Sequence, residues 1–374
     1  MARVLVVNAG SSTIKLSLVE DEDQTIWSSE LAASEARVNA DALGAAIDQV
    51  ADQVDAVGHR IVHGGERFTS AVRIDDAVER ELRALSELAP LHQPKSLAAL
   101  DAVAAALPAA PAYACFDTAF HADLPAAART YALPAAWRKR WPIRRYGFHG
   151  LSHAWVARRA PELLGLAAAD LRIVSCHLGA GASLCAIADG RSQATTMGFT
   201  PLEGLVMATR SGDVDPGLLL WLLERGDMSA GEAGHALEHE SGLRGLAGSA
   251  DMREVLERAG TDADAKLALE VYLHRLSAGI AAMAAALGGL DALVFTGGVG
   301  QRAPAVRAAA AERLGFLGTQ IDPALNAAGE DDRELSAAGA AVRTLVVAAR
   351  EDLEIARQVR QVLGTLSSPP KSEG

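Results

Sequence analysis

The sequence predicts an α/β fold in which two domains are copies of one α/β unit. At 374 residues the chain is longer than a single hydrophobic core usually organises. Apolar runs typical of strands alternate with stretches typical of helices, which favours an α/β architecture. A pattern of strand, small-residue turn and second strand also occurs near the start and again far along the chain, which indicates a duplication.

The first of these hairpins opens the sequence. An apolar run at Val4–Val7 predicts a strand, small residues at Asn8–Ser12 predict a tight turn, and alternation from Ile14 to Leu18 predicts the returning strand. The backbone N–H groups of such a turn can approach an anion closely. A hairpin turn needs small residues whether or not it binds a ligand, so one turn alone does not establish a site.

Two later segments vary the same pattern. Ile173 and Val174 lead into a turn at residues 179–183, after which a second strand is predicted to run to an Asp189-Gly190 turn. Residues 290–314 predict a strand, a glycine turn and then a helix. Three such turns in one acidic chain favour phosphate binding.

The remaining elements are mostly helices. Residues 75–90 and 264–287 have helical composition, and Asp215-Pro216 starts another helix with a capping residue followed by Pro at the first helical position. Residues 341–364 predict a strand and then a helix that close the fold.

Composition excludes several classes of partner. The 35 basic and 47 acidic residues give a net charge of −12, which disfavours nucleic acid and anionic membranes. Cys115, Cys176 and Cys185 lack zinc-site spacing and lie in apolar runs, so we expect buried thiols in a reducing compartment. The apolar runs at the N-terminus and at 276–290 are too short for a signal peptide or a membrane span. We therefore expect a soluble cytoplasmic protein.

Two nucleotide-binding signatures give different answers. The pattern G-x-x-x-x-G-K-[ST] is absent, since no Lys follows a Gly, and this excludes a P-loop. Residues 298–303 fit G-x-G-x-x-A after a predicted strand, and Asp322 lies about 20 residues further on, as in dehydrogenases that bind a nicotinamide cofactor. A dehydrogenase is therefore an alternative interpretation, although this match lies late in the chain and leaves the earlier hairpins unexplained.

Histidine and arginine side chains are the other candidates for chemistry. His149 and His153 are spaced to ligate a metal from one helix, but Gly150 and the aromatic residues before it predict a turn there, so we expect no metal at that pair. Arg60 and Arg210 are the guanidinium groups expected on a phosphoryl group. The alternative is that both make surface or interdomain ion pairs.

Ten segments between residue 4 and about residue 356 together resemble the acetate kinase family. They include VVNAGSSTIKLSL, GHRIVHGGERF, RRYGFHGLSH, TRSGDVDP and VFTGGVG, in the order of that family. The resemblance implies two duplicated ribonuclease H-like domains of the sugar kinase and actin superfamily, with an interdomain cleft that binds ATP and substrate. The implied domains are 1–121 plus 354–374, and 122–353.

The resemblance also implies an activity. It is the reversible transfer of the ATP γ-phosphoryl group to acetate or propionate, by direct in-line displacement, with Mg²⁺ or Mn²⁺ and in a homodimer. The implied catalytic residues are Arg60, Asp117, His149 and Arg210, and the implied metal-binding residues are Asn8, Asp117 and Glu351. The substrate would contact Val62, Leu91, His92, Phe148 and Pro201. The nucleotide would contact Asn8, Ser11, Thr13, Lys15, His177, Gly179, Gly181, Asp251, Arg253, Gly297, Gly298, Val299 and Gly300.

Some positions depart from the family pattern. Ala180 replaces an Asn, Leu151 replaces a Thr, and Gln301 and Arg302 stand where Glu and Asn are usual. These changes bear on the choice of nucleotide, the choice of acyl group and the rate. A catalytically silent, nucleotide-binding regulator is therefore a further alternative.

Overall fold

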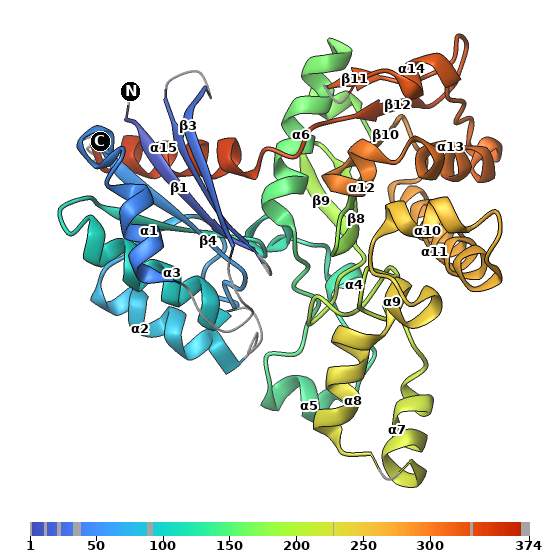
Figure 1. Ribbon diagram of the computed structural model, residues 1–374, viewed down its shortest axis with the longest axis horizontal. Helices are drawn as coiled ribbons and strands as arrows, with labels where there is room; N and C mark the ends of the chain where they lie inside the picture. Colours follow the sequence, from blue (N-terminus) through green and yellow to red (C-terminus); the bar gives the residue numbers. More distant parts are fainter. Residues whose placement is uncertain are drawn as a thin grey trace. The chain divides into compact units, whose positions relative to one another are not determined.

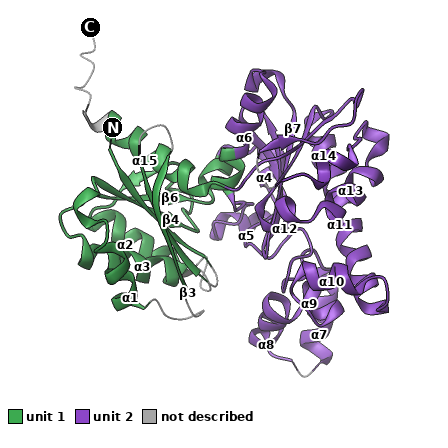
Figure 2. Ribbon diagram, turned by 45° about the horizontal axis from the view of Figure 1, so that its top comes forward, with its two compact units in different colours: residues 1–122, 150–155, 350–374 green, residues 123–149, 156–349 purple. Residues whose placement is uncertain are grey.

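A computed structural model of the chain describes residues 2–10, 13–20, 24–32, 39–87, 93–226, 228–329 and 332–367. The chain divides into two compact units, drawn in two colours in Figure 2. Unit 1 comprises Met1–Ala122, Gly150–Trp155 and Arg350–Gly374, and unit 2 comprises Asp123–His149 and Val156–Ala349. Each is built around its own β-sheet.

The sheet of unit 1 has the strand order β3-β2-β1-β4-β6-β5. The predicted first hairpin is confirmed, since β1 and β2 pair antiparallel. Strand β4 pairs parallel with both β1 and β6, while β3 and β5 pair antiparallel with β2 and β6. The strands are β1 (Val4–Ala9), β2 (Thr13–Val19), β3 (Thr25–Ala32), β4 (Ala56–Ile61), β5 (Val72–Arg73) and β6 (Ala112–Phe116).

The sheet of unit 2 repeats this topology, with the order β11-β12-β10-β7-β8-β9. Its first three strands again form antiparallel pairs, and β10 pairs parallel with β7 and β12. The strands are β7 (Ile173–Leu178), β8 (Ala182–Ala188), β9 (Arg191–Thr195), β10 (Ala292–Thr296), β11 (Arg333–Glu334) and β12 (Arg343–Val346). Two sheets with the same order and directions confirm the duplicated α/β fold.

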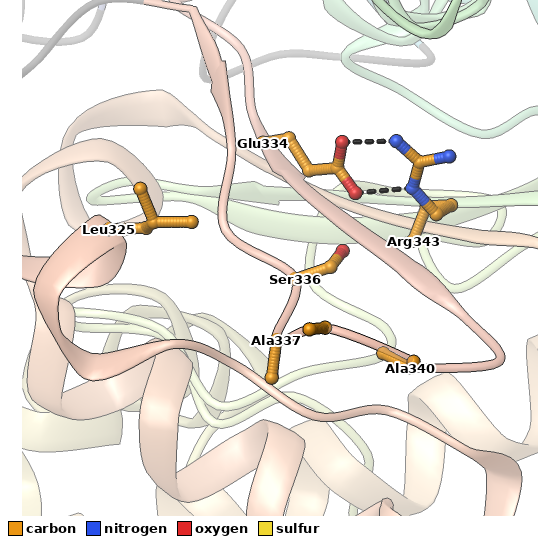
Figure 3. Close-up of a pocket in the computed structure, with 8 residues that line it drawn as sticks. Leu325, Glu334, Ser336, Ala337, Ala340 and Arg343 are labelled. Carbon is orange, nitrogen blue, oxygen red and sulfur yellow. Dashed lines mark hydrogen bonds and ion pairs between the residues drawn. The ribbon is translucent and has the colours of Figure 1, made fainter.

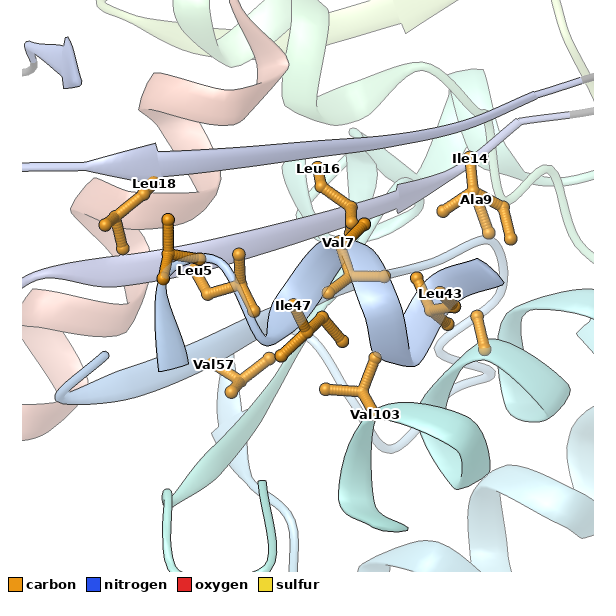
Figure 4. Packing of buried hydrophobic residues seen from close by; sticks show 13 residues of the cluster. Leu5, Val7, Ala9, Ile14, Leu16, Leu18, Leu43, Ile47, Val57 and Val103 are labelled. Carbon is orange, nitrogen blue, oxygen red and sulfur yellow. The ribbon is translucent and has the colours of Figure 1, made fainter. Parts of the chain in front are cut away.

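Helices cover both faces of the unit 1 sheet (Figure 1). Leu5 and Val7 of β1 point to one face, where they pack with Leu43 and Ile47 of α1 and Val103 of α3 (Figure 4). On the opposite face α15 lies so close to β4 that a Cβ on Gly58 would come within 2.6 Å of Ile355. Alternate strand residues therefore face two helical layers. The helices are α1 (Ala40–Ile47), α2 (Asp76–Ala84), α3 (Gln93–Ala106) and α15 (Glu351–Ser367).

In unit 2 the long helix α11 (Ala263–Leu287) packs against β7, β8 and β9. No helix of the described residues is long and apolar enough to cross a membrane. The other helices are α4 (Ala126–Arg129), α5 (Ala135–Arg140), α6 (Gly150–Leu164, which begins in unit 1), α7 (Pro216–Arg225), α8 (Ala230–His235), α9 (Gly242–Ala247), α10 (Met252–Arg258), α12 (Gly297–Arg302), α13 (Pro304–Arg313) and α14 (Pro323–Ala327), with a one-turn π-helix, η6 (Ala236–Glu240), between α8 and α9.

Most predicted elements are confirmed, and two local expectations are wrong. Helix α7 begins at Pro216 with the Asp215 side chain accepting a hydrogen bond from Gly217 N–H, as expected. The predicted third glycine turn, however, is itself helical, because α12 begins at Gly297, whose φ of 76° a residue with a side chain rarely adopts. Gly150 likewise begins a helix, α6, where a turn was expected.

Candidate active site

In unit 1 an ion pair joins the ends of two neighbouring parallel strands. Arg60 lies near the end of β4, and Asp117 directly follows β6. Arg60 Nε donates to Asp117 Oδ1 at 2.9 Å, and Arg60 Nη2 donates to Oδ2 at 2.5 Å. A guanidinium and a carboxylate joined at two points orient each other. The Asp117 side chain is only 2% exposed, so water competes little for this pair.

Asn8 connects this ion pair to the first residue of α15. Arg60 Nη1 donates to Asn8 Oδ1 at 3.1 Å, and Asn8 Nδ2 donates to Glu351 Oε2 at 2.7 Å. Because a guanidinium only donates and a carboxylate only accepts, these two bonds determine which way the Asn8 amide points. We call Asn8, Arg60, Asp117 and Glu351 the Arg60 cluster.

The carboxylates of the Arg60 cluster keep its guanidinium charged. Burial alone would lower the pKa of Arg60, but the charges of Asp117 and Glu351 and the hydrogen bonds to Asp117 raise that pKa above its usual value. The guanidinium therefore stays charged. Two carboxylates thus lie close to one guanidinium, and carboxylate oxygens can also bind a cation.

The backbone also holds Asp117 in place. Gly150 N–H, at the start of α6, donates to the Asp117 carbonyl oxygen at 2.8 Å. A Cβ on Gly150 would lie 2.1 Å from that oxygen, so only Gly allows this approach. The start of α6 therefore packs directly onto the backbone of Asp117.

In unit 2 Arg210 lies beside a carboxylate, Glu238, that was not predicted from the sequence. Its Nε lies 3.0 Å from Glu238 Oε2, and the two side chains are 17% and 12% exposed. Its Nη1 donates to the Pro201 carbonyl oxygen at 3.3 Å. Burial lowers the pKa of Arg210, and the charge and hydrogen bond of Glu238 oppose that shift. Arg60 and Arg210 thus do make ion pairs, each within its own unit.

His149 has an unusual backbone conformation. It precedes α6 with φ 56°, and the structure describes only one other non-Gly residue with positive φ, Asp189 in the predicted hairpin turn. The left-handed region is costly for residues with a side chain, and such residues concentrate at functional sites. His149 lies outside the helix that contains His153, so the two imidazoles do not share a helical face.

The His149 ring is held by two neighbours. Its Nδ1 lies 2.9 Å from Ser183 Oγ, and the ring stacks on His177 with centroids 4.3 Å apart. His177 of β7 and Ser183 of β8 are directly paired across the predicted second hairpin. The hairpin thus contributes two side chains, as well as its glycine turn, to the surroundings of His149.

Gly181, in the turn of that hairpin, makes room for His149 and Arg210. A Cβ at Gly181 would lie 3.3 Å from the His149 ring and 3.5 Å from Arg210 Nη1. The backbone at this turn is therefore near both side chains. His149, His177, Ser183, Gly181, Arg210 and Glu238 together form what we call the Arg210 cluster.

Most of the other predicted nucleotide-binding residues lie on other elements. Asp251 caps α10 and forms a salt bridge with Arg253 at 2.5 Å. Gly298, Val299 and Gly300 follow Gly297 in the first turn of α12, and Gly179 N–H donates to Gly181 O within the hairpin. Thr13 and the exposed Lys15 lie on β2. Their roles in nucleotide binding stay predictions.

The predicted acyl-binding residues are only partly described. Val62 is buried after β4 in unit 1, and Phe148 and Pro201 are buried in unit 2. Ser11, Leu91 and His92 lie outside the described residues.

Two of the family departures lie at positions with local hydrogen bonds. Gln301 Oε1 accepts a hydrogen bond from Ala349 N–H at 3.3 Å, at the end of unit 2. Ala180 is exposed, and its carbonyl accepts from Ala208 N–H in the loop that leads to Arg210.

Ser183 and Glu238 were not predicted from the sequence. Ser183 belongs to the second glycine turn and could have been proposed from its position in that segment. No motif or local sequence pattern marks Glu238 as a site residue. It contacts Arg210 only because η6 folds back onto the loop at 207–211.

A metal-binding cluster and a cavity are two further candidates for a functional site. Within the described parts of the chain, no three His, Cys, Asp or Glu side chains gather so that they could hold a metal ion by themselves. A cavity of about 350 Å³ at the edge of the unit 2 sheet is lined by Leu325, Ser336 and the ion pair of Glu334 with Arg343 (Figure 3). None of the predicted site residues lines this cavity.

Comparisons with known proteins agree on one family. A sequence model of the Acetokinase family matches residues 29–357. The acetate kinase of Gloeobacter violaceus is 50% identical over 314 residues, covering 83% of this chain and 77% of that protein. The acetate kinase of Leifsonia xyli is 44% identical over 394 residues, covering 97% and 99%.

Solved structures extend the similarity to the fold. The crystal structure of Porphyromonas gingivalis acetate kinase has a TM-score of 0.88 and 34% identity, covering 97% of this chain and 100% of that one. That of a propionate kinase from Francisella tularensis has a TM-score of 0.87 and 33% identity, covering 96% and 99%.

Proposed function

The chain belongs to the Acetokinase family, and from that premise we propose how its residues act in the transfer of the ATP γ-phosphoryl group to acetate. Family, relatives and solved structures agree on acetate kinase activity, so the chain is a phosphotransferase with a carboxylate acceptor. The dehydrogenase interpretation of residues 298–303 is therefore wrong. Asp322, its supposed ribose ligand, instead caps α14 by accepting from Ala324 and Leu325 N–H.

The charges of the two substrates determine what the active site must supply. Acetate is already deprotonated at pH 7, so the enzyme needs no strong base to activate it. Two anions must approach each other, so the site must provide positive charge and alignment. The observation that carries our assignment is that Arg60 and Arg210 are only 14% and 17% exposed and that each is oriented by a carboxylate.

We propose that the Arg60 cluster binds the phosphoryl group and a divalent cation. Asp117 and Glu351 offer carboxylate oxygens and Asn8 an amide. Mg²⁺ favours oxygen donors and is commonly held by one or two carboxylates together with water and phosphate. The residues present therefore fit Mg²⁺ or Mn²⁺, which would neutralise phosphate charge when bound. The Arg60 guanidinium stays charged within this cluster.

The Arg210 cluster is proposed to contact the same reacting groups. Arg210 would hold phosphoryl oxygens, and His149 would donate a hydrogen bond from the ring nitrogen opposite Ser183. Direct in-line displacement predicts inverted stereochemistry at phosphorus with isotopically chiral ATP. Retention would instead indicate a phosphoenzyme.

The acyl group is proposed to contact Val62, Leu91, Phe148 and Pro201, with His92 on its carboxylate. The nucleotide is assigned to the glycine segments, Ser11, Thr13, Lys15, His177, Asp251 and Arg253. One methylene in an apolar pocket is worth about 1 to 3 kcal/mol, so we propose that both acetate and propionate are accepted.

Trapping acetyl phosphate as its hydroxamate tests this function. We expect product with ATP, acetate and Mg²⁺, a smaller yield with butyrate, and none after chelation of the metal. Binding of ATP without product from any short carboxylate would instead support a silent regulator.

We further propose that units 1 and 2 correspond to the two expected domains, and that the chain is a cytoplasmic homodimer. Helix α7 supports a dimer, since Leu218, Leu220 and Trp221 are each about half exposed. Light scattering should give twice the chain mass, and Trp221→Glu should lower that mass to one chain.

A further inference from the structure

We infer that Glu238 is a positioning residue for Arg210, which sets the direction of its guanidinium without touching substrate. The inference rests on the proposed function, because it concerns the arginine assigned to the phosphoryl group. Glu238 lies on η6, and π-helices of one turn are frequent at functional sites.

The contact involves one side of the guanidinium. Glu238 Oε2 lies 3.0 Å from Arg210 Nε, while Nη1 lies toward Pro201 O at 3.3 Å and Met207 Sδ at 3.8 Å. The guanidinium is planar, so a bond at Nε sets the plane of the whole group and the direction of its terminal N–H groups.

Backbone bonds tie η6 to the loop that carries Arg210. Ser211 N–H donates to Leu237 O at 3.1 Å, and Ser241 N–H donates to Thr209 O at 3.0 Å. Thr209 Oγ1 donates to Glu238 O at 2.8 Å. The residues on both sides of Arg210 are thus bonded to the segment that carries Glu238. These bonds hold the Glu238 carboxylate in a fixed position relative to Arg210.

Gly242 allows this close approach. Its φ is 63°, and a Cβ there would lie 2.2 Å from Met207 O and 2.7 Å from Arg210 O. A side chain at 242 would push the two segments apart and move Glu238 relative to Arg210.

The neighbours of Arg210 indicate an indirect role for Glu238. Gly181 lets His149 and Arg210 approach the backbone of the hairpin turn, whereas Glu238 is a carboxylate that a phosphoryl oxygen would repel. Ordering a free arginine side chain costs rotamer entropy. A pre-oriented Arg210 has already lost this freedom before substrate binds, which favours the transition state.

Kinetics of four variants test the inference: Glu238→Ala, Glu238→Gln, Arg210→Ala and the double variant R210A/E238A. We expect E238A to lower kcat about 10- to 100-fold with less than about a threefold change in KM for ATP. E238Q should recover much of that loss, because its amide oxygen can still accept the Nε–H bond. In the R210A background E238A should change kcat less than about twofold, because Glu238 acts through Arg210.

Glu240→Gln is the matched control. Glu240 lies on the same π-helix but is 65% exposed and faces His235, so kcat should not change. Folding of each variant is checked by thermal unfolding. A folded E238A with the kcat of the wild type, or an undiminished effect of E238A in the R210A background, would overturn the inference.

The ¹⁵N resonance of Arg210 Nε separates this inference from the proposed function. Assigned by its loss in R210A, its proton should exchange slowly with water in the wild type and quickly in E238A. If the wild type forms no acyl phosphate but this difference is seen, the proposed function fails and the orienting contact stands. Equal exchange in both proteins would overturn the inference whatever the activity.

Discussion

Arg60 and Asp117 bind each other across the carboxyl ends of two paired strands. Arg60 lies opposite Cys115 in the parallel pairing of β4 with β6, and the carboxylate it binds belongs to the residue just after β6. The carboxyl ends of parallel strands are where open α/β sheets commonly bind ligands. The pair thus places a charged, oriented guanidinium at the edge where a ligand is expected.

Asp117→Asn tests the role of the Asp117 charge, because it removes the charge and keeps the shape of the side chain. Asn cannot accept the paired bonds of Arg60 at both oxygens and offers a weaker oxygen ligand to a cation. We expect kcat to fall about 100-fold and the Mg²⁺ concentration for half-maximal activity to rise. Hydroxamate assays across a Mg²⁺ titration measure both. Asp101→Asn, which alters a surface pair with Arg83, is the control. An unaltered Mg²⁺ dependence would remove Asp117 from the metal site.

Gly181→Ala should disturb the Arg210 cluster with little effect on folding. The new Cβ would lie 3.3 Å from the His149 ring and 3.5 Å from Arg210 Nη1, so both side chains must shift slightly. We expect kcat to fall about 10-fold, with the free energy of unfolding changed by less than about 1 kcal/mol. Gly260→Ala has no atom within 4 Å of its Cβ and should retain full activity. Equal kcat for the two variants would show that the spacing at 181 is unimportant.

Two buried histidines predict acid sensitivity. Burial lowers the pKa of both His59 and His63 from 6.5 to about 4. Above pH 6.5 both are neutral in the folded and unfolded states, and their contribution to stability is complete. Between pH 6.5 and 4 only the unfolded chain takes up these protons, so stability is lost as pH falls, by about 1.4 kcal/mol per pH unit for each histidine.

Urea unfolding from pH 8 to pH 4.5 measures this loss. His59→Gln should reduce the slope of unfolding free energy against pH, whereas His274→Gln, at an exposed position on α11, should not. The same slope in wild type and His59→Gln would show that His59 is protonated equally in both states.

The three thiols should be unreactive in the folded protein. Cys115, Cys176 and Cys185 are buried, and burial raises the pKa of each, to about 12 for Cys185. Because the thiolate is the reactive form, a disulfide reagent at pH 8 should label none of them within minutes and all three in denaturant. Ser70→Cys, at an exposed loop position, provides the labelled control. Rapid labelling of the native wild-type chain would contradict this prediction.

Much of the fold could be predicted from local patterns. Alternation of apolar residues around the turns after Asn8 and Leu178 was sufficient to predict both hairpins, since side chains of a half-buried strand alternate between its faces. The error at Gly297 has a local cause as well. Consecutive glycines are typical of a turn, and here they are the start of α12 because Gly297 alone supplies the positive φ that leads into it.

Local patterns and long motifs were enough to predict the duplicated hairpins, the main helices, the family and the arginines expected at phosphate. The partners of those arginines could be identified only once the chain was folded. Arg60 meets Asp117 across 57 residues because β4 and β6 pair in parallel, and Arg210 meets Glu238 because η6 folds back on its loop. Such contacts depend on which surfaces the packing of the apolar core brings together. They cannot be predicted from the spacing of residues along the chain.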